Sequence, residues 1–179
     1  MVLQDHRAIE RLLWPKGRSR DAWMIVDAAR DRRIFGMLLD CFYSSHTCLF
    51  SGDLPPELEV ASPYLVRLEY DMPKTQRFLS HASGNEWGVF LKCGMAQDEL
   101  LRHLRDLLIV RHPNGSDMLF RYYDPRVLRA FLPTCTREEL RAVFGRIERF
   151  WIEDEEPGMM LNAGFDQQQL VLEKLSLQT

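Results

Sequence analysis

A continuous apolar run close to the N-terminus constrains the fold more than any other feature. Residues 22–29 read AWMIVDAA, so bulky apolar side chains follow one another without the alternation of a half-exposed strand. Such a run is typical of a strand that is buried on both faces of its sheet. Since both faces then need cover, the run favours a layered α/β fold with helices on each side.

Helix and strand patterns alternate through the first hundred residues. Apolar residues recur with helical spacing in three segments, 6–14, 32–41 and 96–108, and strand patterns occupy 46–50, 64–68 and 86–93. A further helix is predicted near 73–82, with Asp71 as its cap and Pro73 in its first turn. The alternation indicates an α/β single-domain sandwich around a mixed, partly parallel sheet flanked by helices.

The second half of the chain adds one antiparallel hairpin. Asn114-Gly115 lies between two apolar runs and predicts a hairpin over 109–122 with a type I′ turn. Thr136 and Glu139 have capping-box spacing ahead of a helix that Gly145 ends. A last strand follows in 146–155. We therefore divide the chain into an N-terminal helix and breaker (1–20), a main domain (21–156) and a short C-terminal tail (157–179).

Charge and composition exclude several classes of protein. The net charge is −3, which gives no global argument for nucleic acid. Residues 101–150 hold ten arginines against six acids, and 151–179 hold six acids against one lysine. These segments are either solvated faces or two surfaces that each meet a partner. The opening residues lack a signal-peptide core and no run is long enough to span a membrane, so we expect a cytoplasmic protein. Its four cysteines, without paired spacing, are expected to be reduced.

Two acidic stretches are candidates for chemistry. Asp27, Arg30 and Asp31 follow the apolar run, where a strand end could hold Mg²⁺ or where an aspartate could cap the next helix and pair with Arg30. The second stretch is FRYYDPRVLRAFLP, residues 120–133. Asp124 and Pro125 there have the order of a helix N-cap and first helical residue.

The remaining residues of the second stretch fit the same structural interpretation. Strand alternation sends Tyr122 and Tyr123 to opposite faces of the sheet, so that one of them belongs to the core. Arg126 is expected to pair with Asp27 or with Asp124 across the end of the sheet. We interpret 120–133 as a structural corner, not a catalytic one.

Recognisable catalytic motifs are missing. The sequence has no nucleophile elbow, Walker loop or dinucleotide fingerprint, and its five histidines follow no metal-ligand spacing. We expect no enzyme, no cofactor and no metal site. The alternative is a metal-dependent phosphoesterase that uses Asp27, Asp31 and Asp124.

Several phrases in a fixed order resemble one family. They are WMIVDAARD, CLFSGDLPPELEVASPYLVRLE, WGVFL, HLRDLLIV, MLFRYYDPRVLRAFLPT and FGRIERFWIEDE, which run from Trp23 to Glu155. Together they resemble the adaptor-chaperone domain of bacterial type VI secretion, often called the Tap or TEC family. The resemblance makes 21–156 the adaptor domain.

The resemblance implies a cytoplasmic, non-catalytic role. Members bind a cognate toxic effector and help load it onto the VgrG spike, often beside a PAAR tip, without a membrane or nucleic acid as partner. The residues that match the family's motifs, as structural or partner-binding positions, are Asp27, Arg30, Asp31, Gly52, Asp53, Leu54, Arg121, Tyr123, Asp124, Pro125 and Arg126.

Overall fold

One antiparallel sheet of seven strands forms the centre of the protein. The computed structural model describes residues 6–15, 22–112 and 114–177. The strand order is β2-β3-β1-β4-β7-β8-β9, and every neighbouring pair is antiparallel. The strands are β1 (Ala22–Asp27), β2 (His46–Cys48), β3 (Pro63–Arg67), β4 (Gly88–Lys92), β7 (Arg149–Glu153), β8 (Met159–Asp166) and β9 (Gln169–Ser176).

The prediction of a mixed, partly parallel sheet is wrong. The central strand β1 is buried on both faces as predicted, yet it runs antiparallel to both neighbours, with Ile25 opposite Leu65 on β3 and Val89 on β4. The helix that follows β1 does not return the chain to the edge of β1. It leads to β2, which pairs with β3 at the rim of the sheet, so no parallel crossover unit forms.

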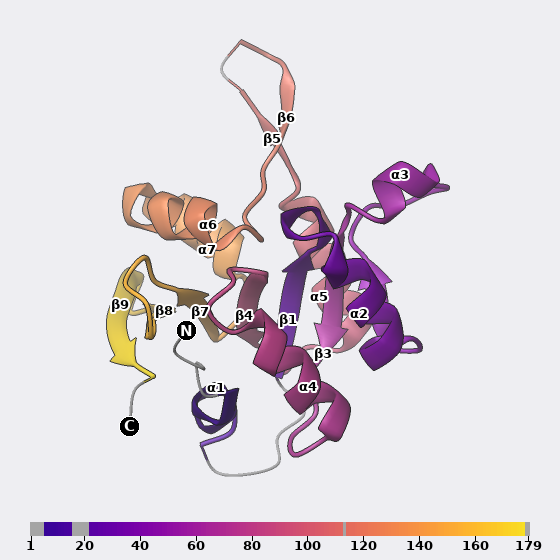
Figure 1. Ribbon diagram of the computed structural model, residues 1–179. Coiled ribbons are helices and arrows are strands. Elements are labelled where there is room, and N and C mark those ends of the chain that lie inside the picture. Colours follow the sequence, from indigo (N-terminus) through magenta and orange to yellow (C-terminus); the bar gives the residue numbers. More distant parts are fainter. Residues whose placement is uncertain (1–5, 16–21, 113, 178–179) are drawn as a thin grey trace.

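Helices cover both faces of the sheet (Figure 1). One core joins the sheet to α1 (His6–Leu13), α2 (Arg33–Phe42) and α4 (Pro73–Ala82) through residues such as Ile9, Leu38 and Phe78. The other joins it to α5 (Gln97–Asp106), α6 (Pro125–Phe131) and α7 (Arg137–Phe144) through Leu104, Leu128 and Leu140. The short α3 (Pro56–Glu59) stands at the periphery, and two 3₁₀ turns, η1 (Ala28–Arg30) and η2 (Leu132–Thr134), complete the elements.

A two-stranded hairpin projects from this body (Figure 1). It consists of β5 (Ile109–Arg111) and β6 (Asp117–Leu119), which confirms the predicted hairpin. The turn differs from the prediction, because the N–H of His112 donates to the carbonyl of Ser116 at 2.8 Å and so leaves three residues between them. Gly115 supplies a positive φ of 88° in that loop, and Pro113 lies outside the described residues.

Two of the predicted helix ends follow local rules and one does not. The capping box of Thr136 and Glu139 is present at the start of α7, and Gly145 follows its end with a φ of 52°. The predicted cap of α4 is wrong: Met72 precedes Pro73 at the cap position without a side-chain bond. Asp71 has a φ of 56° and accepts a bond from the side chain of Gln76 at 3.2 Å.

The last two strands occupy the segment for which the sequence predicts a tail. β8 and β9 form a hairpin that extends the sheet beyond β7, with Asp166 opposite Gln169. Its two turn residues, Gln167 and Gln168, have φ of 45° and 65°, which glutamine seldom adopts. The sequence at this turn therefore lacks the Asn-Gly or Asp-Gly pair that usually predicts a two-residue hairpin loop. At the other end, residues 16–21 of the predicted breaker lie outside the described part.

Two further expectations concern the whole chain. All four cysteines are free thiols in the structure. Among the described residues, no helix combines the length and the apolar character that crossing a bilayer requires.

Candidate functional site

The two acidic stretches of the sequence meet where β1 ends. Asp27 is the last residue of β1, and its Oδ2 accepts a bond from Nη2 of Arg121 at 2.5 Å. The carboxylate side chain is 2% exposed, whereas the guanidinium side is 43% exposed. An ion pair between segments 94 residues apart thus fixes the chain that leads into α6 against the central strand.

Asp27 also has a local structural role. Its Oδ1 accepts from the backbone N–H of Ala29 at 3.2 Å and caps η1. Burial raises the pKa of Asp27, and the neighbouring Arg121 offsets only part of this rise. Asp27 therefore has the predicted role of a cap. Its ion-pair partner is Arg121, whereas Arg30 pairs with Glu86.

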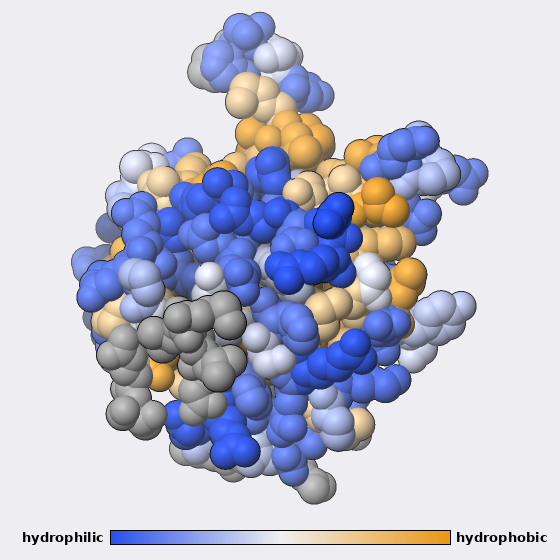
Figure 2. Space-filling view, viewed as in Figure 1, coloured by the Kyte–Doolittle hydropathy of each residue, from blue (hydrophilic) through white to orange (hydrophobic). Residues whose placement is uncertain are grey.

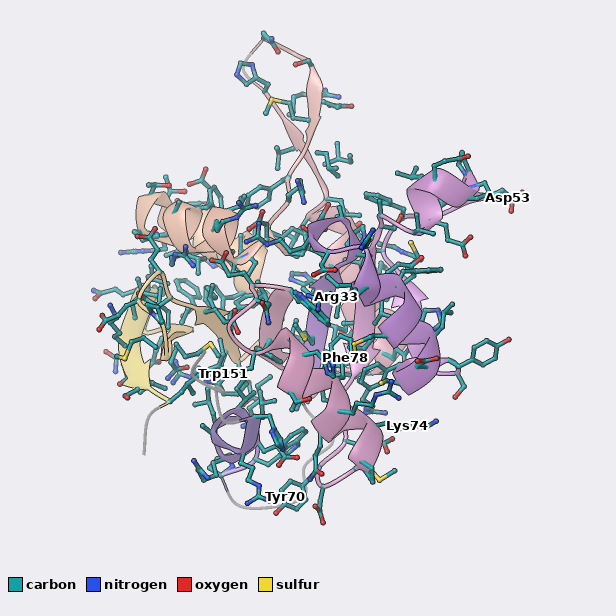
Figure 3. The ribbon with its side chains drawn as sticks, in the orientation of Figure 1. Arg33, Asp53, Tyr70, Lys74, Phe78 and Trp151 are labelled. Atoms are coloured by element: carbon teal, nitrogen blue, oxygen red, sulfur yellow. The ribbon has the colours of Figure 1, made fainter. Side chains whose placement is uncertain are left out.

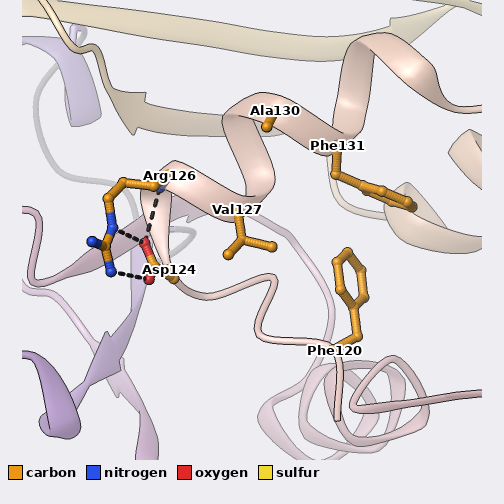
Figure 4. A pocket seen from close by; sticks show the side chains of 6 residues that line it. All are labelled: Phe120, Asp124, Arg126, Val127, Ala130 and Phe131. Atoms are coloured by element: carbon orange, nitrogen blue, oxygen red, sulfur yellow. Dashed lines mark hydrogen bonds and ion pairs between the residues drawn. The ribbon is translucent and has the colours of Figure 1, made fainter. Parts of the chain in front are cut away.

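Asp124 is the N-cap of α6, which confirms the prediction. Its Oδ1 accepts from the backbone N–H of Arg126 at 3.0 Å, and Pro125 occupies the first helical position. Arg126 also binds the carboxylate with its side chain, at 3.0 Å from Nε and 2.7 Å from Nη2 (Figure 4). Burial alone would raise the pKa of Asp124, but these bonds outweigh it and hold the pKa below its usual value.

Replacing Asp124 with alanine should lower the free energy of unfolding by about 0.5–2 kcal/mol, because α6 loses its cap. Asparagine is an equally good cap, so Asp124→Asn should recover most of that loss and forfeit only the ion pair. Urea unfolding at pH 7 measures both variants. Equal losses for alanine and asparagine would mean that the charge and not the cap holds this corner.

Both tyrosines of the corner are buried, which corrects the prediction that only one would be. Tyr122 is 0% and Tyr123 2% exposed. They lie beyond the end of β6, so strand alternation does not apply to them. The hydroxyl of Tyr122 donates to the carbonyl of Leu104 at 2.7 Å, and burial raises the pKa of Tyr123 to about 12.

A second ion-pair group, which the sequence did not predict, lies beside the first. Glu86 pairs with Arg30 at 2.8 Å and with Arg129 at 3.4 Å. Glu153, at the end of β7, accepts the backbone N–H groups of Gly84 at 2.7 Å and of Glu86 at 2.6 Å. Burial raises the pKa of Glu153 to about 7 despite these two bonds. A hollow of about 310 Å³ opens between this group and the turn before β8.

One signal in the sequence could have revealed Glu153. Phe150 and Ile152 of β7 belong to the core under α6 and α7, and Trp151 belongs to the opposite core. Alternation therefore places Glu153 on the side of Trp151, at a position that a core residue would normally fill. A carboxylate there needs hydrogen-bond partners, which the loop before β4 supplies.

The other predicted residues do not join this corner. Asp31 binds Arg33 at 2.6 Å, and that arginine lowers the pKa of Asp31 to about 2. Gly52, Asp53 and Leu54 belong to the exposed loop ahead of α3, where Figure 3 shows Asp53 pointing away from the body.

The carboxylates of the phosphoesterase alternative are each engaged by a different arginine. Asp27, Asp31 and Asp124 bind Arg121, Arg33 and Arg126 respectively. Within the ranges that the structure describes, no three side chains of histidine, cysteine or acidic type gather around one point as metal ligands would. The phosphoesterase alternative requires three carboxylates around one point, and the described residues do not form such a group.

Comparison with known families adds a decisive observation. Residues 22–142 match the model of a family described as "Domain of unknown function (DUF4123)", and this range is about two thirds of the chain. The chain belongs to the DUF4123 family. Neither curated proteins nor solved structures give a match. The DUF4123 range contains both pairs of the corner, Asp27–Arg121 and Asp124–Arg126, and ends before Glu153.

Proposed function

We propose that this DUF4123 protein is a cytoplasmic adaptor that binds one cognate toxic effector of type VI secretion and helps load it onto the VgrG spike. The observation that carries the proposal is the family match over 22–142, because DUF4123 domains are associated with type VI effector adaptors. The ordered phrases between Trp23 and Glu155 support the same assignment.

The chemistry of the corner is compatible with a binding protein. Its acids serve as helix caps, and Asp27 also ties β1 to the segment that leads into α6, so their charges stabilise the scaffold. The guanidinium groups of Arg121 and Arg126, by contrast, remain about half exposed. A rigid scaffold that presents cations at its surface suits recognition of a partner protein.

Deletion of the gene tests this function directly. Delivery of the cognate effector should fall to background in the deletion strain, while the secretion of VgrG and of unrelated effectors stays at the wild-type level. The purified chain should also retain that effector in a pull-down from the non-secreting cytoplasm. A wild-type gene supplied in trans should restore delivery.

Two results would overturn the proposal. One is normal delivery of every effector in the deletion strain. The other is phosphoester hydrolysis by the pure protein with Mg²⁺ that the substitution Asp27→Ala abolishes while the variant remains folded.

A further inference from the structure

The projecting hairpin carries apolar side chains on both of its faces. Ile109, Val110, Met118 and Leu119 are 56%, 40%, 47% and 45% exposed. Figure 2 shows this apolar stalk between a hydrophilic tip and the body. A hairpin of two strands is marginally stable in water unless an apolar face is covered. The hairpin therefore has the properties of an element that a partner completes.

One face of the hairpin continues into the body. Val110 lies opposite Met118, and the N–H of Phe120 donates to the carbonyl of Leu108 at 2.7 Å, which extends the same ladder by one pair. Phe120 therefore shares the face of Met118, two residues away. Its ring packs edge-on against Phe131 of α6, with centroids 4.6 Å apart.

The helix α6 offers a matching apolar stripe. Leu128 points into the core, while Val127, Ala130 and Phe131, with helical spacing of three and four residues, line an open hollow of about 540 Å³ together with Phe120 (Figure 4). Two apolar walls, one from the hairpin and one from α6, thus meet at the contact of Phe120 and Phe131.

Arg126 lines this hollow together with its counter-ion Asp124, and Arg121 directly follows Phe120 in the chain. Arg121 is 43% exposed while its counter-ion Asp27 is 2% exposed, and the same contrast holds for Arg126 at 50% and Asp124 at 4%. In each pair the carboxylate is buried and the guanidinium faces the solvent. Each cation keeps N–H groups beyond those that bind its buried acid, and these are suited to a second carboxylate.

We propose that the docking cleft binds one amphipathic helix of a partner protein. The docking cleft consists of the hollow beside Phe120, Val127, Ala130 and Phe131 together with the adjoining hairpin face of Val110 and Met118. The apolar stripe of that helix would pack against the stripe on α6, as ridges of residues spaced by three and four do, and would touch the hairpin wall with its flank. Acidic residues at its edge would meet Arg121 and Arg126. The proposal rests on the proposed function only in naming the effector as the protein that carries the helix.

Two other occupants fit the surface less well. A second copy of this chain would bring the exposed arginines of two equal clefts together, so that like charges would face each other across the contact. Insertion of the hairpin into a membrane would require its tip to enter the bilayer first. The tip residues His112, Asn114, Ser116 and Asp117 are polar and exposed, so insertion of the apolar stalk would take them, and the ion pair of Asp117 with Arg111, out of water.

The test compares three glutamate substitutions in the purified chain. Met118→Glu and Ala130→Glu place a charge on either wall of the cleft. Val60→Glu is the control, because Val60 is 47% exposed like Met118 but lies beside α3. The probe is each toxin-domain protein encoded in the same secretion gene cluster, titrated by calorimetry. The cleft variants should bind at least ~10-fold more weakly and the control within about twofold of wild type, with all melting temperatures unchanged.

A photo-reactive residue in place of Ala130 then identifies the occupant. The cross-linked segment of the effector, made as a peptide, should gain helical circular dichroism on binding, and its affinity should fall as salt rises. An extended segment, or equal binding by wild type and both cleft variants, would overturn the cleft and leave the proposed function standing. Failure of wild type to bind any effector would remove the function and the cleft together. Met118-dependent binding to anionic vesicles would replace the helix with a membrane.

Discussion

Replacing Gly88 with alanine should destabilise the protein by about 3 kcal/mol, the upper end of the usual range for overpacking a core. A Cβ at Gly88 would lie 1.9 Å from the carbonyl oxygen of Ile25 and 3.0 Å from the Cα of Val26. Both are backbone atoms of the central strand β1, which has β3 on its other side, so neither can rotate away. Strand β4 would have to separate from β1 at this point.

Gly36→Ala provides the matched control in the same protein. Gly36 is in α2, and no atom lies within 4 Å of its added Cβ. Alanine there should stabilise the fold by about 0.5–1 kcal/mol, because glycine is a poor helix residue. Urea unfolding of both variants measures the contrast. A loss below about 1 kcal/mol for Gly88→Ala would mean that β1 and β4 approach each other less closely than described.

Glu153 should make the fold less stable as the pH rises from about 4.5 to about 7. Burial raises its pKa to about 7 in the folded state, against 4.5 for an ordinary glutamate. The folded state then holds a proton that the unfolded chain has lost, so the stability present below pH 4.5 is lost as the pH rises through 7. A shift of this size corresponds to about 3 kcal/mol.

The variant Glu153→Gln isolates this effect, because its amide does not titrate. The amide nitrogen cannot accept a bond, so one of the two N–H donors, from Gly84 or Glu86, loses its acceptor, which costs about 1–3 kcal/mol relative to a fully bonded side chain. The unfolding free energy of wild type minus that of the variant should fall as the pH rises from 4.5 to 7, because only the wild type loses stability over that range. Glu155→Gln, at an 84% exposed side chain, should follow the wild-type profile. Parallel curves for wild type and Glu153→Gln would contradict the raised pKa.

Local signals in the sequence predicted local structure. The helical spacing of apolar residues in 96–108, the capping box at Thr136 and the cap at Asp124 each act within a few residues, and the structure has α5 and both caps there. The hairpin at Asn114-Gly115 was predicted for the same reason, although its loop is longer than a type I′ turn. Propensity and capping can be read from short windows because they need no knowledge of distant neighbours.

Strand direction depends on neighbours that the sequence does not name. An apolar run like 22–29 is expected both for parallel strands and for an antiparallel strand with helices on each face, so burial alone could not fix the direction of β1. The positive φ at Gln167 and Gln168 depends on the surrounding hairpin, and no propensity favours it.

The candidate site was predicted in part for the same reason. Asp27, Arg121, Asp124 and Arg126 were selected from two short stretches, and the structure brings them together. Glu153 and its loop donors lie 67 and 69 residues apart in the chain. The alternation along β7 could have marked Glu153 as an inward-facing carboxylate, but its hydrogen-bond partners could be named only from the tertiary structure.

The pairing of β4 with β7 has a consequence for the protein while it is being made on the ribosome. After Lys92 is synthesised, β4 has only β1 as a neighbour until Arg149–Glu153 have emerged to form β7. At a synthesis rate of about 5–20 residues per second, this interval lasts roughly 3–12 s. During that time the outer edge of β4, next to Phe90 and Leu91, is open to pairing with other nascent chains. The matched family range ends at residue 142, so the ribosome must translate beyond it before β7 can pair with the open edge of β4.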